Sequence, residues 1–337
     1  MNEITLNTPL DMHIHLRDND MLDLVGPLCA KYFSGALVMP NLVKSVTTKK
    51  DVISYKNRII KSIDDNIFTP YMTLFFQKYD KKFLNEVKND ILAVKLYPSG
   101  ITTNSKNGIE QIDTNNLKDT LQAMSDLKIP LCIHGETNGF VLDREKEFIP
   151  IYENIARDFP KLKIIMEHIT TKESVELLEK YDNIYATITL HHLIITLDDV
   201  IGGLLKPHLF CKPIPKKDID RNALLKVALK GHPKVMFGSD SAPHPQHKKE
   251  SCGCAAGVFT SPISLQVLVE LFENNKCLEN LDKFLNKNAI NIYNINPPKK
   301  SITLIKKEFK VPSSYYNKTQ NVIPMYANET LKWSIKE

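Results

Sequence analysis

The chain has 337 residues, of which 42% are hydrophobic and 25% charged, and its formal net charge is +5. This is the balance of a globular protein, so it excludes a disordered or fibrous chain, and a chain of this length can bury a large core without disulfides. The excess of lysine is spread along the chain with no basic block. It mildly favours an anionic substrate and is only weak evidence for nucleic acid, which we do not expect as a partner.

Eight short apolar runs predict eight strands. In chain order they span residues 11–16, 35–41, 68–76, 91–98, 130–136, 163–170, 184–193 and 235–244. Amphipathic stretches between them, such as 113–128 and 171–181, predict helices, the second with Thr171 as a candidate N-cap. Strands that alternate with helices indicate a parallel sheet, and eight such units predict a (β/α)8 TIM barrel with its chemistry at the C-terminal strand ends.

The chain shows no internal repeat and no low-complexity tract. We therefore expect one barrel domain over residues 1–337. The segment from about residue 297 has a mixed pattern, and we interpret it as a C-terminal appendage packed on the barrel.

Six polar residues interrupt the apolar runs near their C-terminal ends. They are His13 and His15 in the first run, Lys95 in the fourth, His134 in the fifth, His168 in the sixth and Asp240 in the eighth. Singly, each has an ordinary explanation, such as a hydrogen-bonded core histidine, a lysine reaching solvent or a turn aspartate. Because the strand ends of a barrel converge on one mouth, the six together predict a metal site.

Four imidazoles and a carboxylate suit zinc, with manganese, cobalt or iron as alternatives. Lys95 is the odd member of the set, because an ammonium group beside divalent cations would be repelled. A neutral amine can instead add carbon dioxide to form a carbamate, an anion with one oxygen for each of two metals. Lysine is the residue whose pKa shifts readily enough for this.

The motifs around these residues resemble those of the amidohydrolase superfamily, specifically of the short, class II bacterial dihydroorotases. The similar segments are HIHLR (13–17), MPN (39–41), KLYP (95–98), HGE (134–136), EH (167–168), FCKPIPK (210–216), GSDSAPH (238–244), CGCAAG (252–257) and the LKWSIK tail. HxH alone is shared by many relatives. HIHLR with the TTN after KLYP, and SDSAPH followed by KKESCGCA, are far more specific.

The resemblance implies two zinc ions per subunit, bridged by Lys95 as N6-carboxylysine. Besides Lys95, the ligands would be His13, His15 and Asp240 for the first ion, and His134 and His168 for the second. Asp240 would also be the catalytic residue that moves the proton. The resemblance further implies a homodimer.

The same resemblance implies a set of substrate-binding residues: Arg17, Asn41, Thr102, Thr103, His134, Lys212, His244 and Ala255. Arg17 has the strand parity of His13 and His15, and its planar fork suits a carboxylate, although it could be a surface arginine. Asn41 after Pro40 could equally be a turn residue. In the CGCAAG loop we prefer Ala255 to Ala256 as the contact.

Residues 99–108 follow the strand that carries Lys95, so they emerge at the predicted mouth. Their Gly, Ser, Thr and Asn content is typical of a mobile loop, with Ile101 as its one apolar anchor. A surface connector is the simpler interpretation. The resemblance implies a lid whose Thr102 and Thr103 reach the substrate.

The activity that the resemblance implies is the reversible cyclisation of N-carbamoyl-L-aspartate to (S)-dihydroorotate plus water, in de novo pyrimidine (UMP) biosynthesis. The alternatives are a hydantoinase, dihydropyrimidinase or allantoinase, or an inactive barrel that acts as a binding partner. The first three generally carry a β-sandwich built partly from residues before the barrel, and His13 lies too early for one. Inactive relatives lose ligands, whereas all six are present here.

The opening residues MNEITLNTPLDMHIH contain no apolar segment long enough for a signal peptide, and no run has the length of a membrane span. We therefore expect a cytoplasmic protein with reduced cysteines and no membrane partner. Cys252-Gly253-Cys254 could suggest a metal, but a structural zinc site usually has two pairs with wider spacing. For His191 and His192 we expect core or surface roles, although one of them could line the mouth.

Overall fold

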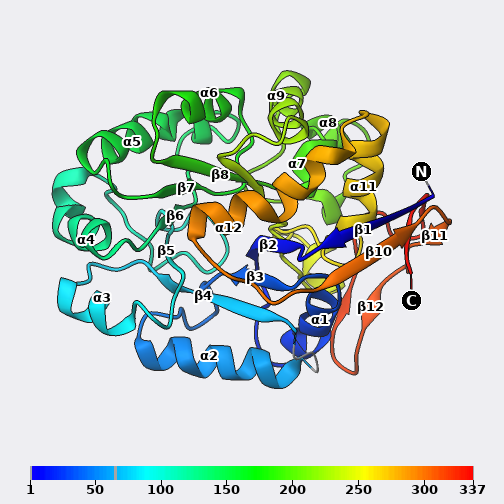
Figure 1. Ribbon diagram of the computed structural model, residues 1–337, viewed down its shortest axis with the longest axis horizontal. Helices are drawn as coiled ribbons and strands as arrows, with labels where there is room; N and C mark the ends of the chain where they lie inside the picture. Colours follow the sequence, from blue (N-terminus) through cyan, green and yellow to red (C-terminus); the bar gives the residue numbers. More distant parts are fainter. Residues whose placement is uncertain (1, 64–66, 337) are drawn as a thin grey trace.

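The computed structural model, which describes residues 2–63 and 67–336, is built around eight parallel strands that neighbour one another in chain order (Figure 1). They are β2 (Leu10–Ile14), β3 (Gly35–Val38), β4 (Thr69–Phe75), β5 (Ala93–Leu96), β6 (Leu131–Ile133), β7 (Ile164–Met166), β8 (Ile184–Ile188) and β9 (Val235–Phe237). A parallel bridge between Ile14 and Ser241 joins the two ends of the sheet and closes the barrel. Each predicted run overlaps one strand, and the predicted (β/α)8 fold is confirmed.

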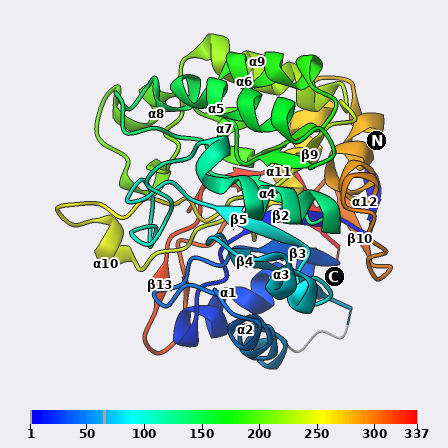
Figure 2. The same ribbon diagram turned by 90° about the vertical axis from the view of Figure 1, so that its left-hand side faces the viewer.

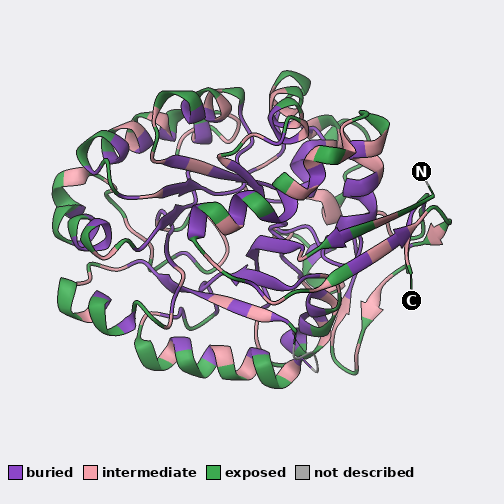
Figure 3. Cartoon of the chain, in the orientation of Figure 1, coloured by how far each residue is buried: buried purple, intermediate pink, exposed green. Residues whose placement is uncertain are grey.

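Helices surround the barrel (Figure 2), and their outer faces are exposed while the strands are buried (Figure 3). They are α1 (Asn19–Tyr32), α2 (Lys49–Ser62), α3 (Lys81–Val87), α4 (Thr114–Leu127), α5 (Arg144–Asp158), α6 (Lys172–Lys180), α7 (Leu190–Ile194), α8 (Leu197–Ile201), α9 (Asp218–Leu229), α10 (Gln246–Lys249), α11 (Ser264–Asn274) and α12 (Asn288–Tyr293), with short η1 (Pro207–Leu209), η2 (Leu278–Asn280) and η3 (Lys283–Lys287) turns. α4 and α6 confirm the predicted helices, and Thr171 caps α6 by accepting a hydrogen bond from the backbone N–H of Ser174. Within the described ranges no helix is long and apolar enough to cross a membrane.

The barrel interior is apolar at one end and polar at the other. Side chains from six strands form a cluster with α12, and its members are Leu10, Met12, Leu37, Met39, Ala93, Cys132, Ile165, Met236, Ala289, Ile292 and Tyr293. Because Leu10 is the first residue of β2, α12 covers the end where the strands begin. The opposite end is left to the polar residues.

The two termini of the chain form a second, small sheet beside the barrel. β1 (Glu3–Asn7) pairs antiparallel with β10 (Ser301–Ile305), which pairs with β15 (Ser334–Ile335). The tail also contains β11 (Phe309–Lys310), β12 (Tyr315–Tyr316), β13 (Asn321–Val322) and β14 (Thr330–Leu331). Outside the barrel the described chain forms only this sheet and two two-stranded pairs, so no β-sandwich is built from it.

Candidate active site

A narrow cavity lies at the C-terminal ends of the barrel strands. It brings together five of the six predicted metal ligands and most of the predicted substrate contacts. Its walls are formed by His13, His15, Arg17, Asn41, Tyr97, Thr102, Thr103, His134, His168, Lys212, Asp240, Ala242, Ala256 and Gly257.

The backbone leaves the strand conformation where these side chains enter the cavity. Arg17, His168 and Asp240 have φ values of 59°, 41° and 43°, in the left-handed region that residues other than glycine seldom adopt. Such strain persists where the surrounding structure enforces it, commonly at functional sites. Arg17 does lie at the cavity with His13 and His15, as predicted, but the predicted cause, a shared side of one strand, is wrong. β2 ends at Ile14, and a turn, not parity, brings Arg17 to the cavity.

One group of ligand atoms comes from β2 and from the segment after β9. Oδ1 of Asp240 lies 3.0 Å from Nε2 of His15 and 3.5 Å from Nε2 of His13, and all three residues are buried. Nδ1 of His13 lies 2.6 Å from Oε2 of Glu167. Since a carboxylate only accepts, Nδ1 carries the proton and the lone pair of Nε2 faces Asp240.

A second group comes from the ends of β6 and β7. Nδ1 of His134 and Nε2 of His168 are 3.2 Å apart, and Nε2 of His134 lies 2.7 Å from Oε2 of Glu136. The Glu136 carboxylate accepts the proton on Nε2, so Nδ1 of His134 turns its lone pair toward His168. The rings of His13 and His168 are 4.8 Å apart between centroids, which makes the two groups neighbours.

Lys95 projects from β5 and is completely buried. Its Nζ has no hydrogen-bond partner in the part of the chain that the structure describes, and it lies 5.1 Å from the ring centroid of Tyr97. Burial lowers the pKa of this amine, which favours its neutral form. Lys95 does not itself line the cavity, but the Tyr97 ring beside it does.

The charge states of the site suit cation binding. Burial lowers the pKa of His15 to about 4 and that of His168 well below its usual value, so both rings are neutral near pH 7. Burial by itself would raise the pKa of Asp240, but the hydrogen bond with His15 and the nearness of the His13 ring bring it below its ordinary range. The cavity therefore offers the neutral rings of His15 and His168 together with one ionised carboxylate.

Two carboxylates that orient the histidines have roles that the sequence did not reveal. Glu167 precedes His168 but contacts His13, and Glu136 follows His134 by two residues and contacts it directly. Burial opposes ionisation of Glu167, yet the neighbouring His13 and Lys95 and the hydrogen bonds with His13 and Thr187 hold its pKa below the ordinary value. The HGE and EH motifs contain both residues, and an acidic residue next to a ligand histidine is the signal that could have found them.

The predicted carboxylate-binding residues are only partly assembled at the cavity. Arg17 and Asn41 line it, whereas His244 stands behind Arg17, with its Nε2 3.1 Å from the Arg17 guanidinium and 3.0 Å from the carbonyl oxygen of Ala256. Burial and the Arg17 charge lower the pKa of His244 to about 2, so its ring is neutral. His244 thus contacts the residues that form the wall.

The 99–108 loop is docked with Thr102 and Thr103 at the cavity. Its one apolar anchor, Ile101, is buried. The Asn41 side chain donates to the carbonyl oxygen of Thr103 at 3.0 Å, and the Lys212 amine donates to that of Ile101 at 2.9 Å. The loop is therefore fastened by two residues that themselves line the cavity.

Ala255, which we predicted to contact substrate, does not line the cavity, whereas Ala256 and Gly257 do. The backbone of Ala255 is already used inside its loop. Its N–H donates to Lys248 O at 3.0 Å, and its carbonyl accepts from the Lys249 amine at 2.7 Å. The cavity wall therefore favours Ala256 over Ala255, and the residue that contacts substrate stays a prediction.

Comparison with known proteins gives a consistent result. A profile described as "Amidohydrolase family" matches residues 9–302. The chain is 43% identical to a dihydroorotase of Helicobacter hepaticus, over 99% of this chain and 98% of that protein, and 38% identical to a dihydroorotase of Aliivibrio fischeri, over the whole of both.

Solved structures agree. A dihydroorotase from Campylobacter jejuni has a TM-score of 0.96 at 55% identity, covering 100% of this chain and 98% of that one. A dihydroorotase from Saccharomyces cerevisiae in complex with 5-fluoroorotic acid has a TM-score of 0.93 at 33% identity, covering 100% and 99%. An L-hydantoinase from Arthrobacter aurescens is 14% identical, with a TM-score of 0.82 over 98% of this chain and 83% of that one, and shares the fold alone.

Proposed function

The chain belongs to the amidohydrolase family and, within it, to the dihydroorotases, and from this we infer that it is a hydrolase of cyclic amides that interconverts N-carbamoyl-L-aspartate and (S)-dihydroorotate. One observation supports this cavity as the active site. Five side chains at the ends of four strands bring nitrogen or oxygen atoms to one cavity, near the buried amine of Lys95.

We propose that this cavity holds two zinc ions. Two ligands on one tetrahedral zinc, with bonds of about 2.0–2.1 Å, lie about 3.3 Å apart, and the facing nitrogens of His134 and His168 are 3.2 Å apart. The other ion would be held by His13, His15 and Asp240, whose ligand atoms all lie within 4.8 Å of one another. When bound, the ions would lower the pKa of a water molecule and polarise the ring carbonyl.

Lys95 is proposed as the bridging residue, carboxylated to N6-carboxylysine. The support is its electrostatic interaction with His168 and Glu167, the lowered pKa of its amine and its lack of a hydrogen-bond partner in the described structure. An amine that is buried, neutral and unpaired can react with carbon dioxide. The product would replace a buried neutral amine by an anion with two oxygens.

Asp240 is proposed to move the proton. Its low pKa keeps it ionised, and Oδ1 faces the cavity between His13 and His15. In hydrolysis it would take a proton from the attacking water and deliver it to the leaving ring nitrogen, and in cyclisation the reverse. Its strained backbone holds the carboxylate at the mouth rather than along the strand.

The substrate carboxylate is proposed to bind Arg17 and Asn41, with His244 positioning Arg17. The Arg17 Nε donates to the carbonyl oxygen of Pro243 at 3.1 Å, which fixes the plane of the guanidinium. Thr102, Thr103, Lys212 and Ala256 are proposed to surround the ring. An arginine fork suits a carboxylate because it can donate two parallel hydrogen bonds.

We also propose that residues 1–337 act as one domain and that the protein forms a homodimer. Three exposed apolar side chains, of a kind that a second copy could cover, lie at the end of α8 and just after it: Ile201, Leu204 and Leu205. Sedimentation of the purified chain, with Leu204→Asp and Leu205→Asp as variants, tests the dimer.

The function is tested by assaying purified, zinc-loaded protein with dihydroorotate and with hydantoin, before and after chelation. We expect turnover of dihydroorotate alone, with loss on chelation. A metal-loaded sample that turns over neither dihydroorotate nor carbamoyl aspartate would remove the proposal. The hydantoinase alternative is not favoured, because similarity to those structures is limited to the fold.

A further inference from the structure

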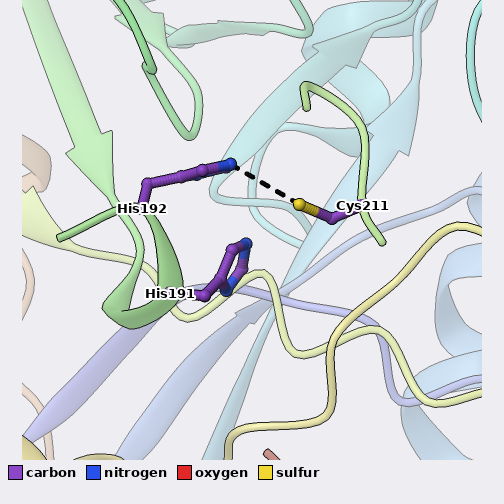
Figure 4. A group of neighbouring side chains, drawn as sticks. All are labelled: His191, His192 and Cys211. Carbon is purple, nitrogen blue, oxygen red and sulfur yellow. Dashed lines mark hydrogen bonds between the residues drawn. The ribbon is translucent and has the colours of Figure 1, made fainter. Parts of the chain in front are cut away.

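Two adjacent histidines and a cysteine form a second buried cluster that the proposed reaction does not use. His191 and His192 belong to α7, directly after β8, and Cys211 follows η1. All three are at most 2% exposed. Figure 4 shows a ring nitrogen of His191, a ring nitrogen of His192 and the sulfur of Cys211 pointing toward a common centre.

The distances in this cluster match those around a shared metal ion. Nε2 of His192 and Sγ of Cys211 are 3.6 Å apart, and one ligand atom from each of the three residues lies within 4.8 Å of the others. Bonds of about 2.0–2.1 Å to nitrogen and about 2.3 Å to sulfur would place those two atoms about 3.5–3.7 Å apart. The carbonyl oxygen of Pro213 lies 3.0 Å from Nε2 of His192 and 3.3 Å from Sγ, where it could act as a fourth donor.

His191 supplies the independent observation. Neither of its ring nitrogens has a hydrogen-bond partner among the residues that the structure describes, although the side chain is fully buried. Buried polar atoms nearly always have a partner, and a metal ion would supply one for the His191 nitrogen that faces His192 and Cys211. Burial lowers the pKa of His191 to about 4, which leaves a lone pair available at neutral pH.

His192 can present its Nε2 lone pair because of Thr189. Oγ1 of Thr189 lies 2.9 Å from Nδ1 of His192, so it can accept the ring proton at that position. The proton then sits on Nδ1, and Nε2 is free to coordinate. In the competing arrangement, Nε2–H of His192 donates to the carbonyl oxygen of Pro213, and His192 is an ordinary core histidine. That arrangement gives no reason for the two unpartnered ring nitrogens of His191.

We propose that His191, His192 and Cys211 bind one thiophilic transition-metal ion of the zinc class, at a site separate from the catalytic cations. A donor set of two imidazoles and one sulfur selects such ions over magnesium or calcium. On binding, the Cys211 thiol releases its proton to solvent and the thiolate forms the bond to the metal. The ion would fasten the segment 211–213 to α7 and thereby hold Lys212 at the cavity wall.

The test uses the full chain produced in cells grown with cobalt in place of zinc. A thiolate bound to Co(II) gives a sulfur-to-cobalt charge-transfer band in the near ultraviolet. The proposed catalytic ligands contain no sulfur, so the band reports the new site alone. We expect the wild type to show it and to hold one more cobalt ion per chain than Cys211→Ser, in which the band is lost.

Two controls distinguish this site from other thiols. Cys29→Ser removes an equally buried cysteine in α1, and the double variant Cys252→Ser/Cys254→Ser removes the thiols of the CGCAAG loop; both should keep the band. His191→Gln should weaken cobalt binding at this site at least tenfold. If Cys211→Ser fails to fold, His191→Gln tests the proposal in its place. We expect this variant to fold, because the His191 side chain has no described hydrogen bond to lose. A folded wild type without the band, a band that survives Cys211→Ser, or one that disappears in the loop variant would each overturn the proposal.

Discussion

Glu167 orients the ring of His13 through a hydrogen bond: Oε2 of the carboxylate is 2.6 Å from Nδ1 of the ring. The other ring nitrogen, Nε2, then faces Asp240. The two residues come from β2 and from the end of β7, so this contact spans the barrel interior. It determines which nitrogen of His13 can bind a cation.

The first prediction follows from this contact. Glu167→Gln should lower metal affinity by about 10- to 100-fold, the usual effect of losing a partner that orients a ligand histidine. Isothermal titration with zinc measures it. Glu176→Gln, on the exposed face of α6, is the matched control. Equal affinities in the two variants would show that Glu167 does not orient His13.

Lys95→Ala should abolish activity and the binding of one of the two metal ions, because alanine cannot bridge. Added short carboxylic acids should restore part of the rate by occupying the space that the amine leaves. Metal analysis and steady-state rates give the result together. A Lys95→Ala protein with two ions per chain and the wild-type rate contradicts the bridging role.

Asp240→Asn should reduce kcat by about 10²–10⁴-fold, the usual contribution of general acid–base catalysis, with a smaller change in KM. The amide cannot accept and return the proton. Since Asp240 is also a proposed ligand, zinc content is measured alongside the rate. A fully metallated variant with a near-normal kcat excludes the proton-transfer role.

Thr102→Ala and Thr103→Ala should each lower kcat/KM by about 10- to 100-fold, because a hydrogen bond to a charged group contributes about 1.5–3 kcal/mol. Metal content should be unchanged, since the loop supplies no ligand. Lys106→Ala changes an exposed side chain of the same loop and serves as the control. If both threonine variants stay within about twofold of the control, less than one such bond is worth, the loop is only a connector.

Lys249→Met should raise KM more than it lowers kcat and should reduce the free energy of unfolding by on the order of 3 kcal/mol. The buried amine donates to the carbonyl oxygens of Phe210, Ala255 and Gly257, at 3.0, 2.7 and 2.8 Å. These hydrogen bonds join the segment before Lys212 to the segment that ends at Gly257, and none of their groups is a proposed ligand of the catalytic cations. Lys248→Met, at the exposed neighbour, is the control in denaturant titration and kinetics, and equal behaviour of the two variants refutes the positioning role.

The strands and the convergence of His13, His134, His168 and Asp240 could be predicted, because both depend on local pattern and on the order of strands in a closed barrel. The orientation of each ring could not. It depends on Glu167 and Glu136, and the partner of Glu167 is distant in the chain.

The placement of Ala256 instead of Ala255 likewise depends on where Lys249 finds its acceptors, which no periodicity records. The pairing of β1 with β10 was also hidden, because two short strands at opposite ends of a chain carry no signal of each other.

The pairing of β1 with β10 bears on when the site can be completed during biosynthesis. β2, which carries His13, follows β1 almost directly, and β1 is bound by a strand that begins at Ser301. A ribosome delivers the chain from its N-terminus, at roughly 5–20 residues per second. The partner of β1 therefore leaves the ribosome only after all eight barrel strands, so the segment that leads into β2 is fixed later than the barrel sheet itself.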